Sequence, residues 1–116
     1  MSIENYLSSW QERAKSGAQQ RSAAVHRARE HLADLAKELR LLGSRRTWLV
    51  GSLARGTFTS HSDIDLLVEG MTEETAWRAA EQLSEKLGMA VEVLRTEDMG
   101  AGWRRHHETY GELLDG

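Results

Sequence analysis

The stretch that decides the fold is residues 51–66, GSLARGTFTSHSDIDL. It follows a short run of β-prone residues, 47–50, and it leads into a second such run, 64–68. The glycines between the two runs predict a turn, and residues 53–55 are able to form a single helical turn after Gly-Ser. We therefore expect a strand, a glycine-containing turn and a second strand that begins with Asp-Ile-Asp.

The two aspartates of this stretch are candidate metal ligands. Asp63 and Asp65 are two positions apart, so on a strand their carboxylates point to the same face. Neighbouring carboxylates raise each other's cost of ionisation, and Mg²⁺ is the natural compensating cation because it prefers oxygen ligands. Two acids at strand spacing alone are more often ion-paired surface residues. The presence of Gly51-Ser52, separated from Asp63 by ten residues, favours the metal site.

The Gly-Ser pair provides hydrogen-bond donors and space for an anionic ligand. Gly51 lets a ligand approach the backbone closely, and Ser52 offers a hydroxyl group and a backbone N–H. The helical turn predicted after them would point further N–H groups at a phosphate. A metal-bridged phosphate between such a turn and a carboxylate pair is typical of phosphoryl- or nucleotidyl-transfer sites.

Composition and the absence of other motifs exclude several classes of protein. Thr57-Phe58 stands where a Walker motif requires Lys-Ser/Thr, and no Gly-x-Gly-x-x-Gly occurs. The 116-residue chain has no cysteine, which excludes disulfides, zinc-thiolate sites and thiol catalysis. Residues 43–62 carry a net charge of +3 and residues 63–98 a net charge of −7, within an overall charge of −3. This favours a small anionic ligand or a metal at the junction, with no direct nucleic-acid binding.

The rest of the chain is predicted to be mainly helical. Residues 3–41 are expected to form one helix with a kink near Gly17, or two helices. A further helix should begin after Thr72 and end at Gly88, and residues 89–94 should form a third strand. Residues 97–114 are expected to form a last helix. The predicted buried stripes are Val25, Ala28, Leu32, Leu35, Ala36 and Leu39, then Ala76, Ala80, Leu83 and Leu87, after a first stripe of Tyr6, Leu7, Trp10 and Ala14. Trp48, Trp77 and Trp103 are core candidates, and Trp10 is either packed or part of an interface.

The motif resembles a known family. Residues 51–56, GSLARG, and 62–66, SDIDL, match the Gly-Ser-x-Ala-Arg-Gly and Ser-Asp-x-Asp-Leu pattern of minimal nucleotidyltransferases in the DNA polymerase β-like superfamily. The resemblance covers roughly residues 24–96. It implies the polymerase β-like nucleotidyltransferase fold, of the α+β (mixed α/β) class, with a small mixed sheet flanked by helices and a long N-terminal helical segment.

The same resemblance implies roles for individual residues. Asp63 and Asp65 would hold two Mg²⁺ ions, and Glu92, where the family more often has Asp, would ligate the catalytic metal or accept a proton from the acceptor hydroxyl. Gly51 and Ser52 would hold the β- and γ-phosphates of ATP.

Two further residues belong to the predicted phosphate-binding group. Arg55 either binds phosphate or pairs with an acid and braces the turn, and the sequence leaves both interpretations open. Ser62, in the loop before the carboxylates, is expected to orient the motif. His61 beside it is expected to be exposed to solvent.

The resemblance also implies a function. Many small members of the family are encoded with a HEPN-domain toxin and act as its antitoxin, transferring AMP from ATP to a toxin tyrosine. Two alternatives stay open. The chain could neutralise its partner by binding alone, with weak or lost catalysis, or it could modify a small molecule such as an antibiotic, with a homo-oligomer supplying the missing substrate site.

The length fits a single nucleotidyltransferase domain over residues 1–116. We expect an N-terminal helical extension (1–20), a family-like core (21–96) and a C-terminal helix (97–116). No apolar run approaches the roughly 18 residues of a membrane span, and the first residues lack the basic and apolar regions of a signal peptide. The expected location is cytoplasmic.

Overall fold

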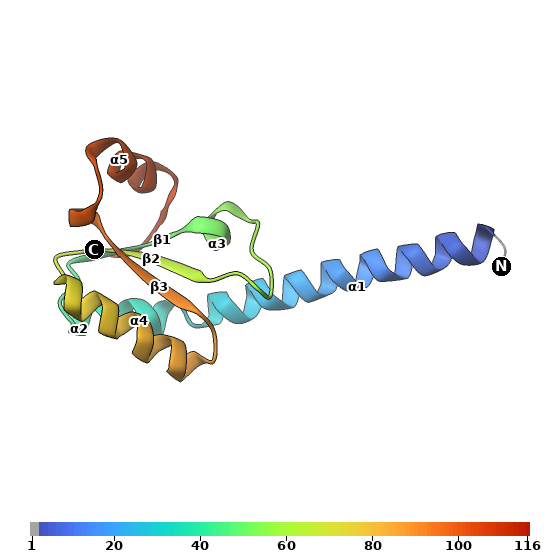
Figure 1. Cartoon of the computed structure of the whole chain (residues 1–116), viewed down its shortest axis with the longest axis horizontal. Coiled ribbons are helices and arrows are strands. Elements are labelled where there is room, and N and C mark those ends of the chain that lie inside the picture. Colours follow the sequence, from blue (N-terminus) through green and yellow to red (C-terminus); the bar gives the residue numbers. More distant parts are fainter. Residues whose placement is uncertain (1–2) are drawn as a thin grey trace.

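The computed structural model describes residues 3–116, with side chains from residue 17 onward, and centres on a four-stranded sheet (Figure 1). The strands are β1 (Arg46–Val50), β2 (Ile64–Glu69), β3 (Val91–Arg95) and β4 (Glu112–Asp115), in the order β3-β2-β1-β4. β1 runs antiparallel to β2 and β4, whereas β2 and β3 are parallel. The predicted α+β class with a small mixed sheet is confirmed.

The helices are α1 (Ile3–Glu30), α2 (Leu32–Leu41), α3 (Gly51–Arg55), α4 (Glu73–Leu87) and α5 (Ala101–Tyr110), with a short 3-10 turn η1 (Thr96–Asp98). α4 makes the crossover that two adjacent parallel strands require. The Thr72 hydroxyl caps α4 by accepting a hydrogen bond from the Thr75 N–H at 3.2 Å. Gly88 ends α4 in the left-handed conformation, φ 64°, which favours glycine. The predicted limits of this helix are confirmed.

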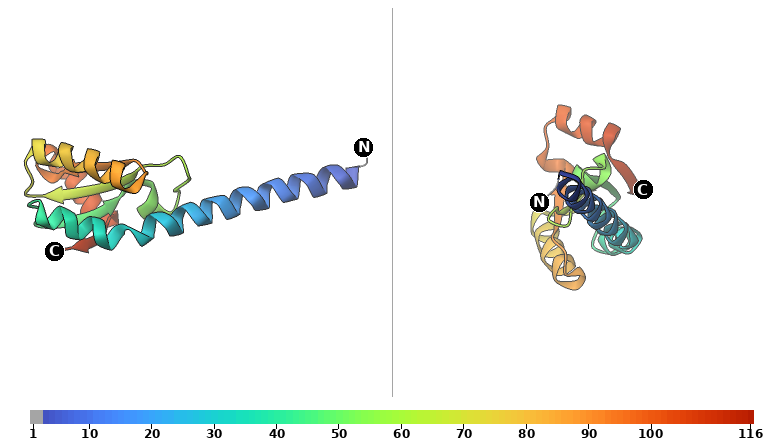
Figure 2. Two further views of the ribbon diagram at one scale, coloured as in Figure 1. Left: turned by 90° about the horizontal axis from the view of Figure 1, so that it is seen from below. Right: turned by 90° about the vertical axis from the view of Figure 1, so that its right-hand side faces the viewer.

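One face of the sheet packs on the C-terminal part of α1 and on α2 and α4; α2 and α4 lie below the sheet in the right-hand view of Figure 2. The strands contribute alternate residues to this core, because successive side chains of a strand point to opposite faces. In β2 these residues are Ile64, Leu66 and Val68. Of the predicted stripe in residues 25–39, all members are buried except Val25, which is partly buried.

The opposite face of the sheet is apolar at one end and acidic at the other. Its apolar end is a second cluster formed by Trp48, Val50 and Leu67, with Leu94 and Met99 partly buried against them. Asp65 and Glu92 have the same phase in their strands as Leu67 and Leu94, so they lie on this face too. α5 lies on this side of the sheet, away from α2 and α4 (Figure 2).

The N-terminal helical segment forms two helices, but the break lies at His31 and the kink expected near Gly17 is wrong. The residues after Gly17 are good helix formers and tolerate one glycine. At His31 the backbone N–H donates to the carbonyl of Ala28, three residues back, at 3.2 Å. This 3-10 contact tightens the turn and separates α1 from α2.

α1 extends well beyond the sheet, and the molecule measures 61 × 32 × 20 Å (Figures 1 and 2). The side chains of the first predicted stripe, Tyr6, Leu7, Trp10 and Ala14, lie outside the described residues. None of the helices within residues 3–116 combines the length and the apolar character needed to cross a bilayer.

The C-terminal segment differs from the predicted single helix over 97–116. It holds η1, α5 and then β4, which pairs with the outer edge of β1. β4 has only four residues, so its sequence shows little strand periodicity, and the edge of β1 fixes its conformation. Trp48 is buried as expected, but Trp77 and Trp103 are 66% and 68% exposed, so their prediction as core residues is wrong.

Candidate active site

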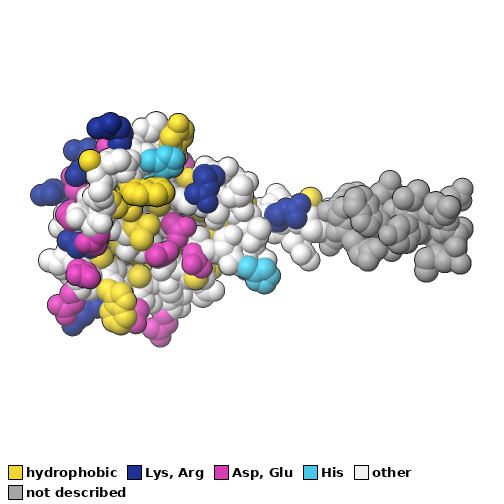
Figure 3. Space-filling view, turned by 45° about the horizontal axis from the view of Figure 1, so that its top comes forward, with side chains coloured by type: hydrophobic (Ala, Val, Ile, Leu, Met, Phe, Trp, Pro, Cys, Tyr) yellow, Lys and Arg dark blue, Asp and Glu magenta, His cyan; other side chains and the backbone are white. Residues whose placement is uncertain are grey.

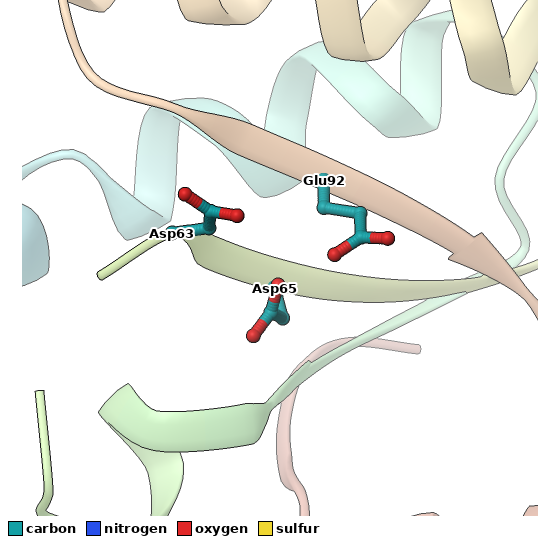
Figure 4. A group of neighbouring side chains, drawn as sticks. All are labelled: Asp63, Asp65 and Glu92. Atoms are coloured by element: carbon teal, nitrogen blue, oxygen red, sulfur yellow. The ribbon is translucent and has the colours of Figure 1, made fainter. Parts of the chain in front are cut away.

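Three carboxylates converge on the acidic end of the sheet (Figure 4). Asp63 directly precedes β2, Asp65 is the second residue of β2, and Glu92 lies opposite Asp65 in the parallel pairing of β2 with β3. Each side chain offers one oxygen such that the three atoms lie within 4.8 Å of one another. Register and strand alternation therefore bring the three predicted acidic residues together.

The acidic group carries negative charge that the protein itself balances only in part. Burial raises the pKa of Asp65 from 3.8 to about 6, and the neighbouring carboxyls of Glu92 and then Asp63 add to the rise. The positive charge of Arg55 acts in the opposite direction. A cation bound between the carboxylates would relieve this repulsion, and oxygen ligands of this kind suit Mg²⁺.

The turn after β1 lies against the same carboxylates. α3 begins at Gly51, whose φ of 72° is a left-handed conformation that favours glycine. A Cβ atom at this position would overlap the Asp65 carboxyl group and come within 3.0 Å of its carbon. Gly51 is thus required both by its backbone conformation and by its closeness to Asp65. Ser52 follows it, half-buried, in the first turn of α3.

Ser62 and Arg55 border this turn in different ways. The Ser62 hydroxyl oxygen accepts a hydrogen bond from the Thr59 N–H at 3.0 Å and lies 3.2 Å from the Thr59 hydroxyl, so it is part of the loop that leads into Asp63. Arg55 is exposed at the end of α3. Among the residues whose side chains the structure describes, Arg55 has no ion-pair partner, which does not support the bracing interpretation.

On the Asp63 side, the site opens into a hollow of about 240 Å³. Arg27 of α1, the loop residues Ser60 and His61, and residues 87–90, at the end of α4 and before β3, line it together with Asp63. His61 is exposed, as expected. Of the three carboxylates, Asp63 is the one that borders this hollow.

α5 also contributes side chains to this face of the sheet, which the sequence did not indicate. Trp103 and His107 stack with ring centroids 6.1 Å apart, and His106 and Tyr110 lie 4.8 Å apart. We call these four residues the aromatic face of α5. Their spacing of three, four and seven positions was a signal of one helix face, but it does not distinguish a core stripe from an exposed one.

A model of the nucleotidyltransferase domain family matches residues 29–107, which include all the residues of the acidic group and of the turn. The chain belongs to the nucleotidyltransferase domain family. No match to a curated protein reaches significance.

Three solved structures are similar to the chain. A chain of a toxin–antitoxin complex with AMP-PNP is 26% identical, with a TM-score of 0.62, over 69% of this chain and 68% of that one. A protein assigned as a minimal nucleotidyltransferase is 23% identical, with a TM-score of 0.67, over 79% of this chain and 95% of that one. A chain of a complex between a tri-AMPylated HEPN toxin and an MNT antitoxin from Shewanella oneidensis shares the fold, at 18% identity and a TM-score of 0.53 over 73% and 72% of the two chains. The chain is thus a nucleotidyltransferase-domain protein that shares its fold with a protein assigned as a minimal nucleotidyltransferase.

Proposed function

We propose that this nucleotidyltransferase transfers AMP from ATP to a hydroxyl group, that the acceptor is a tyrosine of a HEPN-type toxin, and that the chain is the antitoxin of that toxin. The observation that carries the proposal is the convergence of Asp63, Asp65 and Glu92 beside Gly51. The proposal is also supported by the similarity to a toxin–antitoxin complex with AMP-PNP and to a complex of an AMPylated HEPN toxin.

The residues of the acidic group fit Mg²⁺. They offer three carboxylate oxygens within 4.8 Å of one another, and the raised pKa of Asp65 reflects charge that a cation would balance. When bound, Mg²⁺ stabilises negative charge on phosphate oxygens and makes a hydroxyl group a better nucleophile. We assign Asp63 and Asp65 to hold the metal, with Glu92 completing the set.

The chain's own groups then have separate tasks in the transfer. Gly51 and Ser52 bind the β- and γ-phosphates through the backbone and hydroxyl of the first turn of α3, and the charge of Arg55 supports them. The acceptor oxygen forms a bond to the α-phosphorus while the bond from that phosphorus to the bridging oxygen breaks, and pyrophosphate leaves. We assign the exposed Glu92 carboxylate to accept the hydroxyl proton, as the alternative to ligating the metal.

The proposal is tested by incubating the protein with ATP labelled at the α-phosphate, Mg²⁺ and the cognate HEPN protein. The partner should become labelled, and Asp63→Asn and Asp65→Asn should abolish the labelling. Asp34→Asn, which neutralises an exposed carboxylate on α2, is the matched control and should label normally.

Two results would contradict the proposal. Absence of both Mg-ATP binding and labelling in the wild type would remove the catalytic function. If Asp65→Asn still forms the complex and still suppresses toxicity in cells as the wild type does, the antitoxin works by association and the transfer is not what neutralises the toxin.

A further inference from the structure

If the phosphates of a nucleotide bind at the acidic group, its sugar and base must extend over one side of that group. α5 lies on one of these sides. Gly111, which joins the C-terminal end of α5 to β4, is packed tightly on the end of β1, directly before α3. A Cβ atom at Gly111 would lie 3.1 Å from both the Leu49 carbonyl oxygen and a methyl carbon of Val50. Further along α5, the guanidinium of Arg104 donates a hydrogen bond to Glu69 of β2 at 2.7 Å. These contacts fix α5 over the same sheet face that carries Asp65.

The aromatic face of α5 presents planar groups on the side of the sheet that carries Asp65. Trp103 and Tyr110 are 68% and 69% exposed. Between them, His106 lies 6.0 Å from Trp103 and 4.8 Å from Tyr110, and the ring of His107 is inclined by only 27° to that of Trp103. Figure 3 shows histidine and hydrophobic side chains above a group of acidic side chains on this face, with basic side chains at their flank.

Arg55 links the two parts of the face electrostatically. Its charge acts on the Asp65 carboxyl group and also on His107, whose pKa is lowered by burial first and by the charges of His106 and Arg55 in addition. Arg55 of the phosphate turn therefore lies within electrostatic reach of both the acidic group and α5. Val50 directly precedes Gly51 and Gly111 directly follows Tyr110, so the close approach of Gly111 to Val50 brings the Tyr110 end of α5 to the phosphate turn.

The alternatives among the described residues do not offer such a surface. The other large exposed aromatic side chain is Trp77 of α4, and α4 packs on the opposite face of the sheet, against Ile64 and Leu66. The hollow beside Asp63 is lined by Arg27, serines and His61 and suits a polar acceptor. Bases stack on exposed aromatic side chains because every base has a π-face.

We propose that the aromatic face of α5, chiefly Trp103 and Tyr110 with the two histidines between them, binds the base of the nucleoside triphosphate by stacking. This assignment rests on the proposed function, since it requires the phosphates to bind at Gly51-Ser52 and the acidic group. It adds a base subsite to that site and gives α5 a role in substrate binding.

The experiment compares two probes on the full chain, Mg-ATP and Mg-tripolyphosphate, by calorimetric titration. Tripolyphosphate can occupy only the phosphate and metal half of the site, whereas ATP occupies both halves. Trp103→Leu and Tyr110→Leu should each weaken Mg-ATP binding by about 5- to 100-fold, the range expected for the loss of one stacked aromatic side chain. Both variants should bind Mg-tripolyphosphate as the wild type does.

Trp77→Leu is the matched control, because Trp77 is 66% exposed on a helix of the other face. It should leave both affinities unchanged. All three side chains are exposed, so the variants should keep the circular dichroism spectrum of the wild type.

Wild-type affinity for Mg-ATP in both α5 variants would overturn the assignment while leaving the proposed function intact. If labelling of the HEPN partner fell at unchanged ATP affinity, α5 would bind the acceptor and the base assignment would again be wrong. An equal loss of affinity for Mg-ATP and Mg-tripolyphosphate would show that α5 affects only the shape of the phosphate site. This result would also overturn the base assignment. If the wild type bound neither probe, both the proposed function and the base subsite would be wrong.

Discussion

Asp65→Asn should stabilise the protein when no divalent metal is present. The Asp65 carboxyl group is half-buried between Glu92 and Asp63, and its pKa is raised from 3.8 to about 6. A group whose pKa rises on folding binds protons more tightly in the folded state, so its contribution to stability is lost as the pH rises through that interval. Above about pH 6 the wild type carries the full cost of the buried charge, whereas an asparagine carries none.

The magnitude follows from the shift. A difference between 3.8 and about 6 corresponds to about 3 kcal/mol at roughly 1.4 kcal/mol per pKa unit. Solvent screening of a half-buried carboxylate reduces this to about 1–2 kcal/mol. We expect Asp65→Asn to raise the free energy of unfolding by this amount at pH 8, and the difference should fade toward pH 4.

Urea denaturation with EDTA present, followed by circular dichroism at pH 8, 6 and 4, measures the effect. Asp34→Asn is the control and should change stability by no more than about 0.5 kcal/mol at any of these pH values. With Mg²⁺ at ten times its Kd, the wild type alone should gain about 1.4 kcal/mol. An Asp65→Asn protein that is no more stable than the wild type at pH 8 without metal would refute the assignment of unbalanced charge to this site.

Three further outcomes follow from the same geometry. The affinity for Mg²⁺ should fall about tenfold per pH unit below pH 6, because the proton competes with Mg²⁺ for Asp65. An Mg²⁺ affinity that does not change between pH 5 and 7 in isothermal titration would contradict this. Gly51→Ala should lower the free energy of unfolding by about 1–3 kcal/mol and abolish nucleotide binding, because its φ is 72° and the new Cβ would overlap the Asp65 carboxyl. Gly56→Ala is the control: its φ is also positive, but the space around its Cβ is open, so this variant should bind nucleotide. Gly111→Ala should displace α5 from Val50 and weaken Mg-ATP more than Mg-tripolyphosphate in titrations, and unchanged ATP affinity would show that the tight packing there does not matter.

The strand, turn and strand around the motif could be predicted from the sequence because local rules determine them. Gly51-Ser52 ends β1 where glycine is required, and Asp63 and Asp65 share a face because strand side chains alternate. Glu92 was a candidate through the family resemblance. Its position opposite Asp65 depends on the parallel register of β2 and β3, which α4 and the core determine and which no local pattern encodes.

The errors have a common origin in tertiary context. The stripe of Leu32, Leu35 and Leu39 continues the periodicity of α1, so the pattern gave no indication of the break at His31. β4 exists because the edge of β1 is available to it. Trp103 has helical spacing suited to a core, yet it is exposed, because η1 and the close packing at Gly111 set how α5 lies on the sheet.

The most direct test of a nucleotidyl-transfer site is the fate of two labels in parallel reactions with the HEPN partner and Mg²⁺. ATP labelled at the α-phosphate should transfer its label to the partner, and ATP labelled at the γ-phosphate should release its label as pyrophosphate. Asp65→Asn should transfer neither label, and Asp34→Asn should behave as the wild type. Transfer of the γ-label, or equal transfer of the α-label by wild type and Asp65→Asn, would contradict the assignment of Asp63, Asp65 and Glu92 as the catalytic group.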